Sequence, residues 1–411
     1  MAQTKPKISV LVVGAGPVGL LTSLRVAKEG IQVTVLEALP AVEESPRAMA
    51  YQPIAVKELD RAGILADVRA VGGSGKSVCW RKTSTGEVIV RMERFVTPEH
   101  PYENLVIGQH ELAAVILQHL EKLPGVKVCW NTRVVKVERN DDEAVRVAAE
   151  RPDGEVEFYD GDYLVGADGG RSTIRKLCEI PFDGFQYPEQ LVSTNVYYPF
   201  DKFGWEDANF LIDPEHWALV AKINEKGLYR VSYGERDGLT QQQIEERMPW
   251  KYAQMFPGLK PPNYKLDQMS PYRLNQRCAG TFRKGRIMLA GDAAHLCNPF
   301  GGLGLTGGLL DAAALADALI AIYQGLATDS ILDHYAQMRR ETFLDIVNPT
   351  SQANKRRLHE PDPETVGEMD PFLRALREAD TNTKQNLRSH SKLASDMSQF
   401  YQQDHNAAQV K

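Results

Sequence analysis

The sequence predicts an α/β fold: a parallel β-sheet with helices, interleaved with an antiparallel β-sheet and followed by a helical C-terminal part. Three observations predict it. The apolar runs Ile8–Val13 and Ile31–Leu36 flank the helical pattern Pro17–Lys28, which gives a βαβ unit. Residues 186–270 hold strand-like pieces joined by polar turns. Arg286–Ala290 then returns to the apolar type of a buried parallel strand.

The remaining elements follow in order along the chain. Periodicity predicts helices around Val56–Leu65 and over Gln109–Leu123, Thr240–Tyr252, Gly307–Tyr323 and Ile331–Phe343. Alternating or apolar runs predict strands over Val78–Val90 with a turn at Ser84–Gly86, Val126–Arg133, Val134–Arg139, Val145–Glu150, Val156–Tyr159, Asp162–Gly166, Leu191–Tyr198, Trp217–Ile223 and Tyr229–Tyr233. Beyond Asn348 the composition is polar, so residues 351–411 are expected to form a helical appendage with a loose end.

Composition argues against several classes of protein. The chain has 411 residues, a formal net charge of −6 and no dense block of Lys and Arg, which argues against a nucleic-acid-binding surface. Its five cysteines show no metal-binding spacing, and their odd number is typical of free thiols in a reducing compartment. No run reaches the ~18 apolar residues of a membrane span. We therefore expect a cytoplasmic protein with no metal site and no membrane span.

The turn between the first strand and the first helix reads Gly14-Ala-Gly16-Pro-Val-Gly19. In a GxGxxG turn the first glycine allows the tight bend, the second lets the backbone approach a pyrophosphate, and the third lets helix and strand pack closely. The helix N-terminus attracts the pyrophosphate. Glu37 closes the second strand, where an acidic residue accepts hydrogen bonds from ribose hydroxyls. The unit therefore predicts a dinucleotide site, without deciding between NAD and FAD.

Two downstream regions separate these cofactors. Tyr163–Arg175 reads YLVGADGGRSTIR, Gly285–His295 reads GRIMLAGDAAH, and Asn298–Gly308 continues as NPFGGLGLTGG. With the GxGxxG turn, these segments closely resemble the three fingerprints of the class A flavoprotein monooxygenases, the para-hydroxybenzoate hydroxylase-like family. The fingerprints are the GxGxxG, "DG" and "GD" motifs, and they occur here in the family's order. The resemblance covers residues 8 to about 345.

The resemblance implies a Rossmann-like FAD-binding domain of the glutathione-reductase type, interleaved with an antiparallel β-sheet substrate domain and followed by a helical C-terminus. We expect the FAD-binding domain at residues 1–75, 100–185 and 271–350, the substrate-binding sheet at 76–99 and 186–270, and the helical appendage at 351–411. By resemblance FAD is non-covalent and contacts a set of residues beyond Gly14, Gly16, Gly19 and Glu37. These further contacts are Arg47, Ala50, Gln109, Asp168, Gly291, Asp292, Gly302, Gly304 and Leu305, the last through its backbone N–H.

Several of these residues also have a purely structural interpretation. Asp292 follows a buried strand, where an unpaired charge is costly, so it either binds a ribityl hydroxyl of FAD or caps a helix. Asp168 either lies near the pyrophosphate or forms an Asx-turn. Arg47 is otherwise a surface arginine and Gln109 a helix-start residue. His295 corresponds to a structural histidine of the family rather than to a base.

The chain also departs from the family pattern. Leu305-Thr306 stands where the GD tail commonly reads Gly-x-Asn, so the contact to flavin O2 is in doubt. The sequence ends soon after the FAD-binding part, too early for the thioredoxin-like third domain of the phenol hydroxylase branch. Residues 351–411 have no counterpart that can be assigned. Tyr335 and Arg339, in contrast, match the Y…R segment that follows the GD motif.

In the family, NADPH or NADH reduces FAD, O2 then gives a C4a-hydroperoxyflavin, and one oxygen atom passes to an electron-rich carbon of a small aromatic molecule. Pro299 stands where the family has a proline carbonyl beside the reacting ring. Aromatic residues of the second sheet are candidates for the opposite wall, although each could simply be a packing or surface residue. No catalytic base can be named, and the protein could be a monomer or a homodimer. The candidate wall residues are Tyr197, His216, Trp217 and Tyr229.

Other functions on the same fold remain open. A flavin halogenase should carry a Trp-x-Trp-x-Ile-Pro segment, and none of the five tryptophans stands in one. An epoxidase of sterols or terpenes usually has a membrane anchor, which the sequence does not show. An isoprenoid reductase and, from a different class, a non-catalytic FAD-binding redox sensor are further alternatives. Oxidation of NADPH with and without phenols would separate them.

Overall fold

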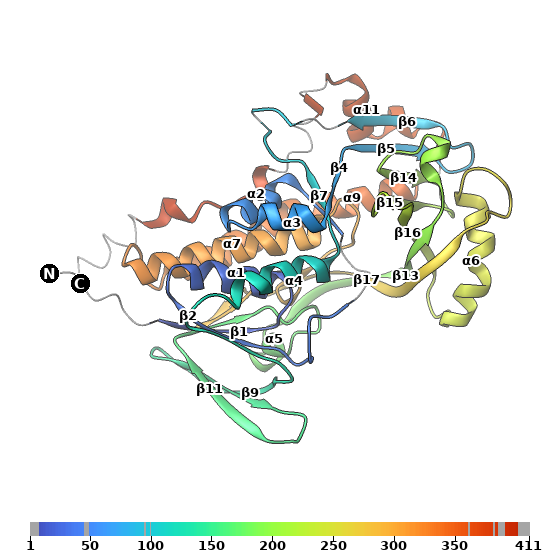
Figure 1. Ribbon diagram of the computed structural model, residues 1–411. Helices are drawn as coiled ribbons and strands as arrows, with labels where there is room; N and C mark the ends of the chain where they lie inside the picture. Colours follow the sequence, from blue (N-terminus) through green and yellow to red (C-terminus); the bar gives the residue numbers. More distant parts are fainter. Residues whose placement is uncertain are drawn as a thin grey trace.

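The computed structural model describes residues 8–44, 49–93, 96–98, 100–360, 362–380, 383–384 and 391–401. The predicted α/β class, with a parallel sheet interleaved with a largely antiparallel one, is confirmed. Figure 1 shows two bodies joined by long strands, with helices over the first sheet and a second large sheet at the other end.

The first sheet has six strands in the order β18-β19-β12-β1-β2-β8. β1 runs parallel to both β12 and β2, so the predicted βαβ unit sits at the centre of the sheet. Its apolar strands are buried because helices α1, α4 and α7 cover one face (Figure 1). The strands are β1 (Ser9–Val13), β2 (Gln32–Leu36), β8 (Val126–Cys129), β12 (Tyr163–Gly166), β18 (Arg283–Lys284) and β19 (Ile287–Leu289), and the helices are α1 (Pro17–Lys28), α4 (Gln109–Leu120) and α7 (Leu303–Gln324).

Two small sheets flank this body. One has the order β11-β10-β9 and lies on the side away from α1 in Figure 1. The other has the order β3-β7-β4 and carries Ala50 toward α7. Their strands and the neighbouring helices are β3 (Ala50–Tyr51), β4 (Gly73–Gly75), β7 (Asn104–Val106), β9 (Arg133–Asn140), β10 (Val145–Glu150), β11 (Val156–Gly161), α2 (Pro53–Arg61), α3 (Leu65–Val71) and α5 (Thr173–Leu177).

The second large sheet has eight strands in the order β20-β17-β13-β16-β15-β14-β5-β6. All its pairings are antiparallel except that of β14 with β5. Helix α6 covers one face (Figure 1). Its elements are β5 (Ser77–Lys82), β6 (Val88–Glu93), β13 (Phe182–Tyr197), β14 (Ala208–Ile212), β15 (Ala218–Lys222), β16 (Leu228–Arg236), β17 (Lys265–Ala279), β20 (His295–Leu296), α6 (Gln241–Met255) and the 3-10 turns η1 (Phe200–Phe203) and η2 (Gly291–Ala293).

The two faces of this sheet belong to different cores. The α6 cluster joins strand residues such as Val192 and Tyr229 to the buried side of α6, including Tyr252 and Phe256. The Phe300 cluster lies on the opposite face and joins residues such as Leu191 and Trp217 to the C-terminal helices. The fuller membership of the Phe300 cluster is Val78, Trp80, Val90, Met92, Leu191, Phe210, Ile212, Trp217, Leu274, Phe300, Leu358, Val366, Leu373 and Leu376.

The predicted helical C-terminus is present. α8 continues through a π-helical turn into α9, so the three form one long helical stretch. α9 contacts the segment that precedes α7. Shorter helices then pack on β6 and on α7 and α8. These elements are α8 (Ile331–Thr342), η3 (Phe343–Val347), α9 (Asn348–Leu358), α10 (Val366–Met369), α11 (Pro371–Glu378), η4 (Ser391–Leu393) and η5 (Met397–Phe400).

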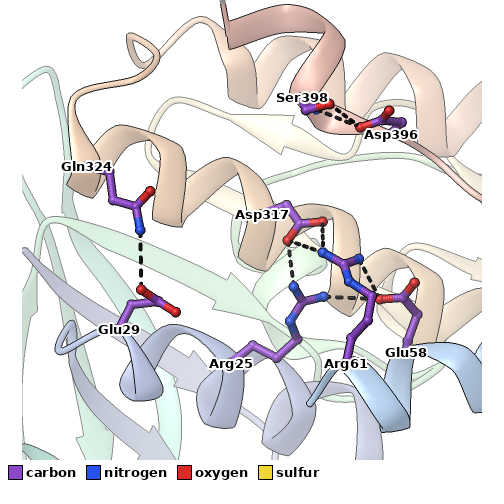
Figure 2. Close-up of polar contacts among 8 residues, drawn as sticks. All are labelled: Arg25, Glu29, Glu58, Arg61, Asp317, Gln324, Asp396 and Ser398. Carbon is purple, nitrogen blue, oxygen red and sulfur yellow. Dashed lines mark hydrogen bonds and ion pairs between the residues drawn. The ribbon is translucent and has the colours of Figure 1, made fainter. Parts of the chain in front are cut away.

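Helices α1, α2 and α7 are joined by a closed ring of charges (Figure 2). Arg25 contacts Glu58 at 3.2 Å and Asp317 at 2.6 Å. Arg61 contacts the same two carboxylates at 2.8 and 3.1 Å. Because Arg25 and Glu58 are largely buried, the alternating charges satisfy one another where water cannot. The ring ties α1 and α7, which carry the glycine-rich segments, to α2, which follows Ala50 and Gln52.

Two strands depart from the predicted pattern. β17 was not predicted, and β13 begins nine residues before the expected Leu191. β13 runs across position 185/186, and β17 runs across position 270/271. A boundary between domains was expected at each of these positions, so the partition by residue range stays a prediction. α7 also begins at Leu303, four residues before the expected Gly307. It is the one helix in the described ranges with the length and hydropathy of a membrane span, and 78% of that stretch is buried in the protein core.

Candidate active site

The glycine-rich turn after β1 has the geometry that its sequence predicts. Gly14 has a φ of +108°, and a Cβ there would lie 2.5 Å from the carbonyl oxygen of Ala167. A Cβ at Gly19 would lie 2.1 Å from the carbonyl oxygen of Gly14. At Gly16 the corresponding position has no atom of the described residues within 4 Å, apart from the adjoining backbone. The fold therefore requires Gly14 and Gly19, whereas the space at Gly16 suits a bound ligand.

Glu37 shapes this turn from the end of β2. Its carboxylate accepts a hydrogen bond from the N–H of Ala15 at 2.7 Å and another from the N–H of Leu39 at 2.8 Å. Among the described residues no side chain caps the N-terminus of α1 at Gly16, so its first N–H groups are available to a ligand. Glu37 thus holds the turn in shape, and its contact to a ribose stays a prediction.

The GD segment brings a second uncapped helix to the same place. Gly291 has a φ of +62°, and Gly302, the N-cap of α7, has a φ of +65°. A Cβ at Gly291 would lie 2.9 Å from Val18 in α1, and one at Gly308 would lie 2.8 Å from the same side chain. In the part of the chain that the structure describes, no side chain caps α7, so the N–H groups of Leu303–Leu305 are available to an electron-rich atom.

The unusual Thr306 has a clear role. Its hydroxyl oxygen accepts a hydrogen bond from the N–H of Gln52 at 3.2 Å. The Gln52 amide donates to the carbonyl oxygen of Gly301 at 2.6 Å, while its own oxygen is buried and has no partner among the described residues. Ala50 presents its carbonyl oxygen 3.2 Å from the Cβ position of Gly302. Thr306 therefore ties the start of α7 to the segment around Ala50 and Gln52.

These segments share one edge of the six-stranded sheet. β1, β2, β12 and β19 are mutually parallel, and Gly14, Glu37, Asp168 and Gly291 all follow their carboxyl ends. Gln109 begins α4, three residues after Val106, which pairs with Ala50. Ligands of open α/β sheets bind at this edge. Two uncapped helix N-termini, the open space at Gly16 and the unpartnered Gln52 oxygen fit an elongated dinucleotide that ends in a polar ring.

Two carboxylates follow the parallel strands. Asp292 is exposed in the turn η2, because Gly291 redirects the chain after the strand, and its contact to FAD stays a prediction. Asp168 accepts hydrogen bonds from the Ser172 hydroxyl at 2.6 Å and the Thr173 N–H at 2.6 Å. It therefore stabilises the start of α5, which is the kind of structural role that the Asx-turn interpretation of Asp168 describes. Arg47 lies outside the described residues.

His295 belongs to a buried ionic network. Its Nε2 lies 2.7 Å from Asp311, which also binds the Nε of Arg339 at 2.7 Å and the N–H of Gly291 at 3.0 Å. Burial alone would raise the pKa of Asp311, but the neighbouring His295 and Arg339 hold it below its ordinary value. Arg339 also donates to the carbonyl oxygen of Leu393 at 2.7 Å. The geometry supports a structural histidine.

Two predicted wall residues lie on the wrong face of the large sheet. Tyr229 is fully buried in the α6 cluster, where its ring contacts Phe200 at 4.9 Å. His216 packs edge-on against Trp250 of α6 at 5.1 Å, and burial lowers its pKa. Both therefore lie away from Phe300, and their assignment to a pocket beside Pro299 is wrong.

The opposite face does approach Pro299. Phe300, the next residue, packs edge-on against Trp217 at 5.5 Å between ring centroids. Tyr197 shares the strand parity of Leu191, which belongs to the Phe300 cluster, so it lies on this face. Tyr197 and Pro299 thus stay candidates for a substrate pocket.

Sequence reasoning missed the polar centre of this face. Arg230 follows Tyr229 on the same strand, so its side chain lies on the opposite face of the sheet, and it is buried, at 8% exposure. Its Nε donates to the Asn195 side-chain oxygen at 2.7 Å, and Asn195 donates to Gln268 at 3.1 Å. Burial lowers the pKa of Arg230 to about 10. A lone arginine inside the apolar pattern Tyr229–Tyr233 was the available signal.

Comparison with known proteins agrees with this geometry. Residues 7–350 match the family described as FAD binding domain. Para-nitrophenol 4-monooxygenase from a Pseudomonas strain is 44% identical over 86% of this chain and 88% of its own length. 6-Hydroxy-3-succinoylpyridine 3-monooxygenase from Pseudomonas putida is 37% identical over 87% of this chain and 90% of its own.

A solved structure extends the likeness to three dimensions. The crystal structure of p-nitrophenol 4-monooxygenase from Pseudomonas putida superimposes with a TM-score of 0.88 and 39% identity, covering 95% of this chain and 99% of that one. Aklavinone-11 hydroxylase in a ternary complex with FAD and aklavinone, at 24% identity and a TM-score of 0.76, shares the fold. The chain therefore belongs to the FAD binding domain family and is a class A FAD-dependent aromatic monooxygenase that uses NAD(P)H and O2.

Proposed function

We propose that the aromatic substrate is a small phenol bearing a polar, electron-withdrawing group, and that 4-nitrophenol is the first compound to test. The buried guanidinium of Arg230, on the face that carries Trp217 and Tyr197, is the observation that supports this substrate class. A guanidinium suits a nitro, phenolate or carboxylate oxygen because it presents several donors in one plane. The names of the two relatives include a nitrophenol and a hydroxylated pyridine with a succinoyl group.

The cofactor and the residues around the site have different roles in the reaction. FAD, when bound, accepts a hydride from NAD(P)H and activates O2 for transfer of one oxygen atom. The balanced reaction consumes NAD(P)H, a proton, O2 and the phenol, and yields NAD(P)+, water and the oxygenated product. Arg230 and Asn195 orient the substrate on the sheet, and Trp217 with Phe300 excludes water from one side. Pro299 forms the boundary toward the cofactor.

We assign the cofactor contacts as follows. The N-terminus of α1 binds the pyrophosphate, and the first turn of α7 faces the electron-rich edge of the flavin ring. FAD binds to the protein non-covalently. The residues assigned to FAD are Gly14, Gly16, Gly19, Glu37, Arg47, Ala50, Gln109, Asp168, Gly291, Asp292, Gly302, Gly304 and Leu305.

The test is turnover of 4-nitrophenol by the full chain reconstituted with FAD, using NADPH and NADH in parallel. The expected result is oxidation of the nicotinamide that depends on the phenol, with one atom of isotopically labelled O2 in the product. Benzene serves as the control, because it lacks both polar groups. Oxidation that yields only hydrogen peroxide with 4-nitrophenol and with other substituted phenols would contradict the proposal.

A further inference from the structure

A cavity lies at the end of the Phe300 face away from Arg230, and none of the residues assigned to the proposed reaction site lines it. Its volume is about 250 Å3, and it lies between the β13 residue Tyr187 and the α9 region. That volume is below the roughly 300–1,000 Å3 typical of sites for drug-sized ligands, so it suits a single-ring molecule. The residues that line it are Tyr187, Gln352, Lys355, Arg356 and His359.

The cavity is separated from the Arg230 site along one strand. Tyr187 and Asn195 are eight residues apart on β13, which at about 3.3 Å per residue corresponds to about 26 Å. Leu191 lies between them, on the face where Trp217 meets Phe300. The aromatic pair therefore stands between the two places.

One wall of the cavity is aromatic. Tyr187 packs edge-on against Phe185 at 5.0 Å, and Phe185 is exposed. The ammonium group of Lys355 lies 4.4 Å from the centre of the Tyr187 ring and 5.3 Å from that of Trp217. Lys355 is buried and forms an ion pair with Glu189, so this pair holds the wall in place.

The other wall carries an uncompensated positive charge. Arg356 is exposed at the cavity, and no carboxylate of the described residues lies within 4.0 Å of its guanidinium. His359, 3.1 Å from Lys355, adds no charge near neutrality, because burial and the neighbouring Lys355 lower its pKa to about 4. Glu189 balances Lys355, and the net charge at the cavity is therefore that of Arg356.

We propose that this cavity is a second binding site for a small aromatic monoanion, with the ring against Tyr187 and the negative charge at Arg356. The choice of 4-nitrophenolate as the ligand rests on the proposed function. The site also reaches the segment before α7: the Tyr187 hydroxyl lies 3.4 Å from the Asn298 amide, and Asn354 of α9 donates to the carbonyl oxygen of Phe300 at 3.1 Å. A phenolate bound here sits directly behind the boundary of the reaction site.

The test is equilibrium dialysis of the FAD-loaded full chain with 4-nitrophenolate, without NAD(P)H. We expect two bound molecules per chain, falling to one in Arg356→Gln and to one in Arg230→Met, with both sites retained in Arg356→Lys. Arg374→Gln, on the exposed side of α11, is the matched control and should keep two. Binding that is the same in Arg356→Gln as in the wild type, whether of one molecule or of two, would overturn the proposal.

Two further probes test the chemistry of the site. Nitrobenzene keeps the ring without the phenolate charge, and inorganic phosphate keeps a charge without the ring. Each should fail to displace the Arg356-dependent molecule at concentrations where unlabelled 4-nitrophenolate displaces it fully. Displacement by nitrobenzene would show a site for neutral rings, and displacement by phosphate a plain anion site; either result refutes an aromatic-anion site.

Dialysis also separates this inference from the proposed function. If 4-nitrophenol is not oxygenated but one molecule still binds in an Arg356-dependent way, the proposed substrate is wrong and the second site stands. If 4-nitrophenol is oxygenated and the wild type binds one molecule whose affinity Arg356→Gln leaves unchanged, the second site is wrong and the proposed function stands.

Discussion

The two faces of the eight-stranded sheet are built from the same strands but follow different rules. The face under α6 is closed by aromatic packing, with Tyr252 and Phe256 stacked at 4.2 Å. The face toward Phe300 buries a guanidinium and an amide, Arg230 and Asn195, among apolar neighbours. The α6 face also buries charge, but it pairs that charge with α6 itself, as Glu235 with Arg247 at 3.0 Å, so it joins the helix to the sheet. On the Phe300 face the bonded residues Arg230, Asn195 and Gln268 all come from strands, which is the arrangement expected of a surface that receives a ligand.

The largest effect should come from the α6 face and should concern stability alone. Phe256→Ala removes a ring that is 2% exposed and is expected to lower the free energy of unfolding by about 3–5 kcal/mol. Urea denaturation followed by circular dichroism measures it. Gln242→Ala, exposed on the same helix, is the control and should change stability by no more than about 0.5 kcal/mol. A changed KM for the phenol in folded Phe256→Ala would break the division between the faces.

The next effect should come from the ligand face and should concern binding. Arg230→Met removes the guanidinium and leaves the buried Asn195 oxygen without its donor, so the free energy of unfolding should fall by about 1–3 kcal/mol. A hydrogen bond to a charged group contributes about 1.5–3 kcal/mol, which corresponds to roughly a ten- to hundredfold rise in the Kd for 4-nitrophenol. Arg230→Lys should recover part of the affinity. Loss of stability with unchanged affinity would make Arg230 a structural residue.

The smallest effect is the pH dependence of stability that His359, beside Trp217 on the Phe300 face, contributes. The pKa of His359 is lowered to about 4 in the folded protein, first by burial and then by Lys355, whereas an unfolded histidine titrates near 6.5. Between these values the unfolded chain binds more protons, so stability should fall as the pH drops from about 6.5 toward 4. Denaturation curves across that window should be less pH-dependent in His359→Gln. Equal slopes in the two proteins would exclude this origin.

The sequence predicts a structural feature well when the residues that determine the feature are close to it in the chain. The turn after β1 was predicted in detail because Gly14 and Gly19 act on neighbouring backbone. β17 was missed because its sequence is polar and contains Pro271; it is extended because it pairs with the whole length of β13. Pro271 is tolerated there because only Arg277 and Cys278 also pair on the other side, with β20.

The residues of the candidate site also fall into those that the sequence could place and those that it could not. Cofactor residues that lie at the ends of the parallel strands could be placed from their motifs. The wall of the substrate pocket could not, because choosing Tyr229 instead of Arg230 shifts the prediction by one residue and so to the other face. The strand before Asp292 was extended one residue too far, to Ala290, whereas β19 ends at Leu289 and Gly291, with a φ of +62°, bends the chain after it.

The contacts of Arg339 have a consequence for how the protein is made. One guanidinium binds Asp311 and the carbonyl oxygen of Gly307 in α7 and also Leu393 and Ser395. During synthesis the ribosome releases the chain from its N-terminus, so Leu393 and Ser395 emerge after every fingerprint segment. The buried charge beside α7 is completed only at that moment. Nascent chains that still lack residue 395 should therefore capture flavin poorly, so cofactor uptake follows the synthesis of Leu393 and Ser395.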